Sequence, residues 1–209
     1  MIAVIDYGRG NLGSVVNGLA RVGMRAEITQ DPAVVRRARA LILPGDGAFA
    51  DAMQNLQALG LLAPLRESLE AGRPFLGICL GYQLLFTESE EFGHAKGLDL
   101  IPGLVRRFPQ TLSAQGIKVP HMGWNRVVHQ GDLPILTGIP SGAYFYFVHS
   151  YYPEPQDRTL KTATCTYGIP FPAVVGKGRL FGTQFHPEKS QRWGLTLLAN
   201  FARLVEGEA

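Results

Sequence analysis

The chain is poor in cysteine, with only Cys79 and Cys165 among its 209 residues. Two cysteines do not make a disulfide framework and favour a reducing compartment, although the sequence alone leaves their pairing open. The amino-terminal segment has no charged stretch ahead of an apolar one, and Asp6 comes too early for a signal peptide. No apolar run approaches the ~20 residues that a membrane-spanning helix requires. We therefore expect a soluble, cytoplasmic protein.

The chain also lacks a strong charge of either sign. Lysine and arginine number 20 and aspartate and glutamate 17, which gives a formal net charge of +3, and the basic residues are scattered. The sequence has no stripe of basic residues with interleaved aromatics, so nucleic acid is not an expected partner. It has no repeats or linkers, and a chain of this length can bury about 70–75% of its unfolded surface. We expect a single domain over residues 1–209.

Short apolar strands alternate with helical patterns through the first part of the chain. This rhythm is typical of a doubly wound α/β fold with a mostly parallel sheet, in which ligands bind at the carboxyl ends of the strands. After an acidic segment at 87–91, which predicts a solvated turn, strands separated by Pro/Gly turns indicate an antiparallel extension. Ser190 is expected to cap a final helix that ends near residue 204. The predicted strands are 2–5, 26–29, 40–43, 74–78, 104–108, 125–129, 144–150, 159–166, 173–176 and 180–185.

The stretch RPFLGICLGYQLLF, residues 73–86, predicts a strand, a sharp turn and a helix with Cys79 at the turn. This is the nucleophile-elbow pattern, with G-x-C-x-G in place of G-x-S-x-G. A helix amino terminus beside a thiol favours the nucleophilic thiolate. The backbone N–H of Leu80 is then placed to stabilise an oxyanion. A buried structural cysteine is the competing interpretation, and the flanking glycines favour the nucleophile.

A cysteine nucleophile needs a base and a group that orients the base. Of the five histidines, His186 follows a clear apolar strand and has a carboxylate, Glu188, two residues further on. Pro187 fixes the backbone between them, so both side chains can project from one end of the strand. These residues predict a catalytic triad of Cys79, His186 and Glu188. A metal site is the competing interpretation, but a second cysteine or histidine at ligand spacing is lacking, and no metal is expected.

Three motifs together resemble the class I (triad) glutamine amidotransferases, and the resemblance spans essentially the whole chain. They are PGDG at 44–47, GICLGYQ at 77–83 and QFHPE at 184–188. Three further motifs are similar to those of the glutaminase subunits of imidazole glycerol phosphate synthase, which acts in histidine biosynthesis. These are PHMGWN at 120–125, YFVHSYY at 146–152 and HPEKS at 186–190. The resemblance implies a flavodoxin-like fold and glutamine hydrolysis that needs no cofactor.

The resemblance also implies a role for each matching residue. Cys79 would form a thioester with the glutamine side chain, and His186 would protonate the departing ammonia and then activate water. Leu80 and Asp46 would supply backbone N–H groups to the oxyanion. The family's loop usually reads PGVG, so the carboxylate of Asp46 could repel an oxyanion if it pointed inward; we expect it to point away. The residues expected to bind glutamine are Gly47, Gln83, Glu91, His149, Ser150 and Tyr151.

The partner implied by the resemblance is a (β/α)₈-barrel cyclase subunit, which forms a heterodimer with the glutaminase and conducts ammonia through its interior. Asn11, Trp124, Tyr146 and Lys189 match positions near that partner. Core packing is the competing interpretation for Trp124 and Tyr146, and a solvated lysine is the competing interpretation for Lys189.

Four alternatives stay open. One is a glutaminase that supplies ammonia to another synthase, such as that of pyridoxal phosphate or anthranilate. The motifs PHMGWN at 120–125 and HPEKS at 186–190 argue against this alternative. A second is a cysteine hydrolase or redox sensor that acts alone, and would have no use for Gln83 and Glu91. A third is a partner-binding module without activity, which the intact triad disfavours. The fourth is nucleotide binding by the G-x-G-x-x-G match at 8–13, a weak signal because no convincing acidic partner follows.

Overall fold

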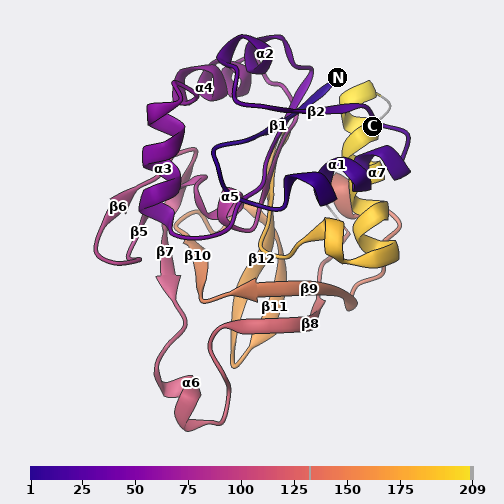
Figure 1. Ribbon diagram of the computed structural model, residues 1–209. Helices are drawn as coiled ribbons and strands as arrows, with labels where there is room; N and C mark the ends of the chain where they lie inside the picture. The colour runs from indigo at the N-terminus through magenta and orange to yellow at the C-terminus, as the bar shows by residue number, and fades with distance from the viewer. Residues whose placement is uncertain (132, 208–209) are drawn as a thin grey trace.

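A seven-stranded sheet forms the centre of the computed structural model, which describes residues 1–131 and 133–207 (Figure 1). The strand pairs β13–β4, β4–β3, β3–β1 and β1–β2 are parallel, whereas the pairs β11–β12 and β12–β13 are antiparallel. The prediction of a mostly parallel sheet with an antiparallel extension is confirmed. The strands lie in the order β11 (Lys161–Tyr167), β12 (Ile169–Lys177), β13 (Leu180–Thr183), β4 (Phe75–Ile78), β3 (Ala40–Leu43), β1 (Ile2–Ile5) and β2 (Ala26–Thr29).

The parallel strands β1, β3, β4 and β13 are buried on both faces, which explains why they are largely apolar, whereas β2 at the edge of the sheet is partly exposed. Successive side chains of a strand point to opposite faces. In β1, Ile2 and Val4 therefore belong to one core, and Ala3 and Ile5 belong to the other. All four are fully buried. The sheet thus separates two apolar cores.

Helices cover both faces of this sheet (Figure 1). The core that contains Ile2 also includes residues of α1 (Leu12–Arg21) and α7 (Gln191–Glu206). The other core includes residues of α2 (Pro32–Arg37), α3 (Phe49–Ala58) and α4 (Leu62–Glu70). Asp31 and Pro32 begin α2, with the Asp31 carboxylate accepting a hydrogen bond from the N–H of Ala33. Within the described residues, no helix is long and apolar enough to cross a membrane.

Two smaller sheets complete the fold. One is four-stranded, in the order β10 (Tyr151–Pro155), β7 (Ile101–Arg107), β5 (Phe86–Ser89) and β6 (Ala95–Lys96). The other is a hairpin of β8 (His121–Val127) and β9 (Ala143–His149). The remaining short helices are α5 (Leu80–Gln83), α6 (Thr111–Ala114), η1 (Pro134–Leu136) and η2 (Pro187–Lys189).

Several predicted boundaries are wrong. The solvated turn predicted at 87–91 is largely β5, in which Phe86 and Ser89 are fully buried. The sequence does not reveal β10, and β12 begins four residues earlier than predicted. Both strands contain prolines, which normally signal turns. The strand predicted at 125–129 begins at His121 instead.

Candidate functional site

Four parallel strands place their carboxyl ends at one edge of the sheet, and the predicted site residues gather there. Tyr7 follows β1, the 44–47 loop follows β3, Cys79 follows β4 and His186 follows β13. These segments border a pocket of about 700 Å³. Its lining residues include all the predicted glutamine-binding and oxyanion positions, Asp46, Gly47, Leu80, Gln83, Glu91, His149, Ser150 and Tyr151, together with Asn11, Cys79, His186 and Lys189.

Cys79 occupies a strained backbone position between β4 and α5. Its φ of 54° and ψ of −110° lie outside the regions that side-chain-bearing residues usually adopt. The two flanking glycines make the corner possible: a Cβ on Gly77 would lie 2.6 Å from the carbonyl oxygen of Gly81, and a Cβ on Gly81 would lie 1.7 Å from that of Leu43. The backbone contacts therefore require glycine at both positions and hold the thiol at the pocket wall.

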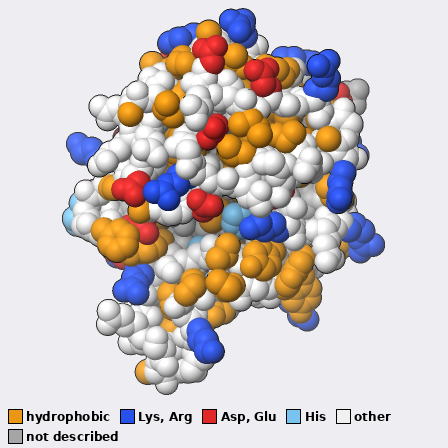
Figure 2. Space-filling model, viewed as in Figure 1, with side chains coloured by type: hydrophobic (Ala, Val, Ile, Leu, Met, Phe, Trp, Pro, Cys, Tyr) orange, Lys and Arg blue, Asp and Glu red, His pale blue; other side chains and the backbone are white. Residues whose placement is uncertain are grey.

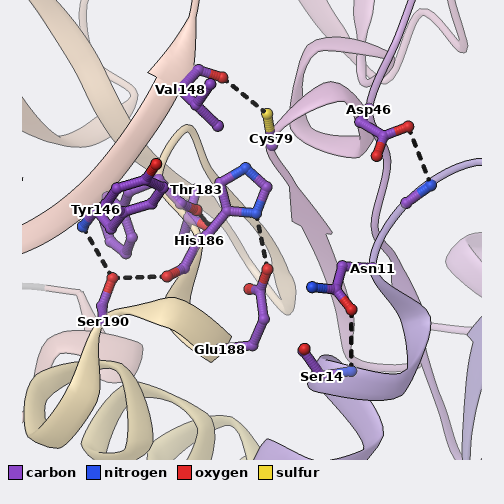
Figure 3. A network of polar contacts seen from close by, with 12 residues as sticks. Asn11, Ser14, Asp46, Cys79, Tyr146, Val148, Thr183, His186, Glu188 and Ser190 are labelled. Carbon is purple, nitrogen blue, oxygen red and sulfur yellow. Dashed lines mark hydrogen bonds and ion pairs between the residues drawn. The ribbon is translucent and has the colours of Figure 1, made fainter. Parts of the chain in front are cut away.

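His186 lies between Cys79 and Glu188 (Figure 3). Its Nδ1 is 2.7 Å from Oε1 of Glu188, and the two side chains are only 9% and 2% exposed. The other ring nitrogen, Nε2, is buried and is turned toward the thiol of Cys79. Burial lowers the pKa of His186, but the charges and hydrogen bonds of Cys79 and Glu188 outweigh it and raise the pKa above its usual value.

Ser190 is the N-cap residue of α7, as predicted, but its side chain makes no capping hydrogen bond and holds the backbone of His186 instead. Its Oγ donates a hydrogen bond to the carbonyl oxygen of His186 at 2.6 Å and accepts one from the N–H of Tyr146 at 3.0 Å. The N–H of His186 also donates to the carbonyl oxygen of Tyr146 at 3.0 Å. The histidine is thus fixed between β9 and the start of α7 (Figure 3).

The 44–47 loop is held in place by contacts on two sides. Oδ1 of Asp46 accepts a hydrogen bond from the N–H of Gly10 at 3.2 Å, and the carboxylate is turned away from Cys79 (Figure 3). This orientation agrees with the sequence-based expectation. On the other side, a Cβ on Gly45 would lie 1.8 Å from the hydroxyl of Tyr7. That hydroxyl is buried and lacks a hydrogen-bond partner within residues 1–131 and 133–207.

Another part of the pocket lining consists of Gln83 and the segment 149–151. Nε2 of Gln83 donates to the carbonyl oxygen of Tyr151 at 3.0 Å and to Oε1 of Gln184 at 3.2 Å. Both amide hydrogens are therefore used, which leaves Oε1 of Gln83 as its free acceptor. The ring of His149 is buried, where it contacts His121 and the carbonyl oxygen of Tyr151.

Glu91 reaches the pocket from the loop after β5. Its Oε2 accepts a hydrogen bond of 2.7 Å from the N–H of Phe49, at the start of α3. Burial raises the pKa of Glu91 above its usual value, although the hydrogen bond from Phe49 acts in the opposite direction. The carboxylate is therefore fixed by a helix terminus while it lines the pocket.

Trp124, Tyr146 and Lys189 form one group beside the pocket. The rings of Trp124 and Tyr146 meet edge to face at 6.1 Å between centroids, and the ammonium of Lys189 lies 5.9 Å from the centroid of Tyr146. Trp124 is 46% exposed, so it is not a core residue. Figure 2 shows apolar side chains gathered over the β8–β9 hairpin on this face. Asn11 stands apart, at the amino-terminal cap of α1.

The sequence did not identify five residues of the site, one of which is Val148, a pocket residue whose carbonyl oxygen lies 3.9 Å from the sulfur of Cys79. Phe92 and Arg107 line the pocket, Tyr7 lies against Gly45, and Gln184 contacts the sulfur of Cys79. Gln184 could have been found, because it lies two residues before His186, a spacing that places side chains on one face of an extended chain. Cys165, in contrast, is a free buried thiol whose pKa burial raises to about 12.

The fold and the arrangement of cysteine, histidine and glutamate are those expected of a glutamine amidotransferase. The family model for "Glutamine amidotransferase class-I" matches residues 3–204, and the chain belongs to this class. Solved structures agree at the level of the fold. The crystal structure of a glutamine amidotransferase has a TM-score of 0.72 at 20% identity and covers 99% of this chain and 100% of its own. The glutaminase domain of Trypanosoma brucei CTPS with bound acivicin has a TM-score of 0.67 at 14% identity, covering 100% of this chain and 94% of its own.

Sequence relatives narrow the class to one family. The imidazole glycerol phosphate synthase subunit HisH of Syntrophotalea carbinolica is 56% identical over 203 residues, which cover 96% of this chain and 98% of the relative. The protein of the same name from Moorella thermoacetica is 55% identical over 204 residues, with coverage of 98% and 95%. The chain is a member of the HisH family, as its motifs predicted.

Proposed function

We propose that this glutaminase subunit of imidazole glycerol phosphate synthase hydrolyses glutamine at the Cys79–His186–Glu188 triad, in one amidotransferase domain spanning the chain. The observation that carries the proposal is the position of His186. One ring nitrogen is 2.7 Å from Glu188 and the other is turned toward the strained Cys79 at the pocket wall. This is the order of contacts that a nucleophile, a base and an orienting group require.

The reaction begins when the Cys79 thiolate attacks the side-chain carbonyl carbon of glutamine. The electron pair moves to the carbonyl oxygen, which backbone N–H groups of Leu80 and the 44–47 loop stabilise. When the carbonyl reforms, the carbon–nitrogen bond breaks, and the His186 imidazolium gives its proton to the leaving ammonia. Neutral His186 then takes a proton from water, which attacks the thioester to give glutamate and the free thiol. Glu188 holds the imidazole in position throughout.

Glutamine is held by Gln83, Glu91 and the segment 149–151, all of which line the pocket. Oε1 of Gln83 and the carboxylate of Glu91 are acceptors, which suits the α-ammonium group of the substrate. Gly47 flanks the substrate, and the backbone of His149, Ser150 and Tyr151 offers groups for the α-carboxylate.

The released ammonia passes to a (β/α)₈-barrel cyclase partner in a cytoplasmic heterodimer. The exposed ring of Trp124 and the half-buried ring of Tyr146, with Lys189 and Asn11, offer the surface for that partner. Aromatic residues are enriched in interfaces because they bury a large area with few rotamers to restrict. Ammonia would then leave the pocket directly into the interior of the barrel.

A reconstitution experiment tests the proposal. Ammonia release from glutamine is measured for the subunit alone, with the barrel partner, and with the partner plus its nucleotide ligand. Synthase partners of pyridoxal phosphate and anthranilate formation serve as matched controls. We expect stimulation by the barrel partner alone. An equal response to another synthase, or no ammonia from any mixture, would contradict the assigned function.

We further predict that the free subunit is a poor glutaminase and that Asp46 contributes to this. The hydrogen bond from Gly10 to the Asp46 side chain ties down a loop whose Gly45–Asp46 peptide must present its N–H to the oxyanion. A missing oxyanion donor costs ~10²–10³ in rate, so the free subunit should be slower than the ligand-bound complex by about that factor. Asp46→Val removes the hydrogen bond from Gly10. It should raise the glutaminase activity of the free subunit and so reduce the difference in rate between the free subunit and the complex.

Initial rates of ammonia release for wild type and Asp46→Val, each free and in complex, check this prediction. Asp51→Val, at an exposed aspartate of α3 that pairs with Arg9 at 3.5 Å, is the control for loss of a carboxylate. If the free wild-type subunit turns over glutamine as fast as the ligand-bound complex, the loop does not limit its activity.

A further inference from the structure

Gln184 is a buried amide that directly contacts the predicted nucleophile. It follows β13, is fully buried, and lies with its Nε2 3.9 Å from the sulfur of Cys79. This distance is within the range for a hydrogen bond to sulfur, which is longer than one to oxygen. Its Oε1 accepts a hydrogen bond of 3.2 Å from Gln83. One side chain therefore connects the nucleophile with the glutamine-binding wall.

The neighbouring groups fix which end of the Gln184 amide faces the sulfur. The carbonyl oxygen of Tyr151 can only accept, so the group of Gln83 that lies 3.0 Å from it must be the NH₂. The second hydrogen of that NH₂ then points to Gln184, which must present its oxygen. The NH₂ of Gln184 is therefore directed at the sulfur, and the amide cannot be reversed without breaking this sequence of bonds.

The carbonyl oxygen of Tyr151 is itself held by a second chain of hydrogen bonds. Nδ1 of His149 lies 2.8 Å from it, Nε2 of His149 lies 3.0 Å from Nδ1 of His121, and Nε2 of His121 lies 3.2 Å from the amide nitrogen of Asn125. Because the carbonyl can only accept, each neutral ring donates through Nδ1 and accepts at Nε2. Burial lowers the pKa of both histidines, to about 3 for His149 and about 4 for His121, so the rings stay neutral.

We propose that Gln184 is a positioning residue that donates a hydrogen bond to the Cys79 thiolate and couples the thiolate to glutamine bound at Gln83. A hydrogen bond to a charged acceptor is stronger than one to a neutral acceptor. The donor therefore favours the thiolate over the thiol and fixes the direction from which the sulfur attacks. This inference rests on the proposed glutaminase function, which it deepens.

Other groups around the sulfur also influence its reactivity and must stay constant in a test. His186 faces the sulfur from the segment after β13, with Glu188 behind it, and His149 interacts electrostatically with His186. Tyr7 interacts electrostatically with Cys79 from the segment after β1. A Gln184→Met substitution leaves all four groups in place, keeps the length of the side chain and removes both polar ends.

The test measures the rate at which iodoacetamide alkylates Cys79 as a function of pH, in the full-length chain and without glutamine. For Gln184→Met we expect the profile to move about one unit to higher pH, with alkylation near neutrality and kcat for glutamine each reduced about tenfold. Gln83→Met, which removes the group that contacts substrate, should mainly raise KM. Both kinetic constants are measured in the complex with the barrel partner.

Asn200→Leu is the matched control for the loss of a buried amide. Asn200 lies in α7, away from the pocket lining, and its Nδ2 donates to the carbonyl oxygens of Ile135 and Thr137. This variant should lower the melting temperature and leave the alkylation profile unchanged. If Gln184→Met does not fold, Gln184→Asn, which keeps the amide but is one methylene shorter, must give a shift in the same direction.

The outcomes separate this inference from the proposed function. An alkylation profile of Gln184→Met that overlies those of wild type and Asn200→Leu would overturn the role of Gln184, even if the wild-type complex hydrolyses glutamine. A wild-type complex that releases no ammonia would overturn the proposed function, whatever the alkylation profiles show.

Discussion

Replacing Cys79 by alanine should reduce glutamine hydrolysis at least about 10⁴-fold, because the covalent intermediate cannot form. The substitution removes a single heavy atom at the pocket wall, so the melting temperature and the affinity for the barrel partner should change little. Product formation by the complex should return when ammonium salt replaces glutamine, because the partner carries its own active site. Failure of ammonium to restore the product would contradict the proposed division of labour.

Selective labelling provides the control for this prediction. An electrophilic glutamine analogue should modify Cys79 and spare Cys165, because burial raises the pKa of Cys165 to about 12 and keeps it as the unreactive thiol. Peptide mapping after labelling distinguishes the two. Cys165→Ala should retain wild-type glutaminase activity, and equal labelling of both cysteines would argue against Cys79 as the nucleophile.

His186→Ala should be nearly as damaging as Cys79→Ala, because the members of a triad act as a unit. Without the imidazole, the leaving ammonia has no proton donor and the attacking water has no base. Glu188→Gln should cost less, since the amide keeps a contact with Nδ1 and loses mainly the charge that stabilises the imidazolium. Steady-state rates of the three variants in the complex give the order directly.

The control for His186→Ala is His94→Ala, a histidine whose side chain is 76% exposed and lies outside the pocket. Its activity should match that of wild type. A Glu188→Gln enzyme slower than Cys79→Ala would reverse the proposed roles, because an orienting group cannot matter more than the group that forms the bond.

The inner strands β1, β3 and β4 of the parallel sheet were predictable because burial on both faces makes their sequences largely apolar. Cys79 was predictable because glycines on both sides of a cysteine, between an apolar strand and a helix, are typical of a nucleophile elbow. β5 and β10 were not predictable from their sequences, because FTES and YYPEP lack a clear apolar alternation and contain polar residues or prolines. Their pairing is set by β7, a contact distant in sequence.

The orientations of individual side chains in the site could not be predicted from the sequence. The PGDG loop identifies Asp46 as unusual, but only its hydrogen bond to Gly10 shows where the carboxylate points. Glu91 was identified by resemblance to the family, and its bond to the start of α3 has no local sequence signal. The contact of Gln184 with the sulfur similarly depends on the orientation of two amides that are 101 residues apart.

The backbone angles of Cys79 imply a conflict between holding the nucleophile and keeping the protein stable. With φ at 54° and ψ at −110°, a side chain at this position costs ~1–3 kcal/mol, whereas glycine adopts such angles readily. Cys79→Gly should therefore be inactive yet melt at a higher temperature than Cys79→Ala, which keeps the strain. Selection for thermal tolerance alone would thus favour loss of the thiol, and only the need for ammonia retains cysteine at this corner.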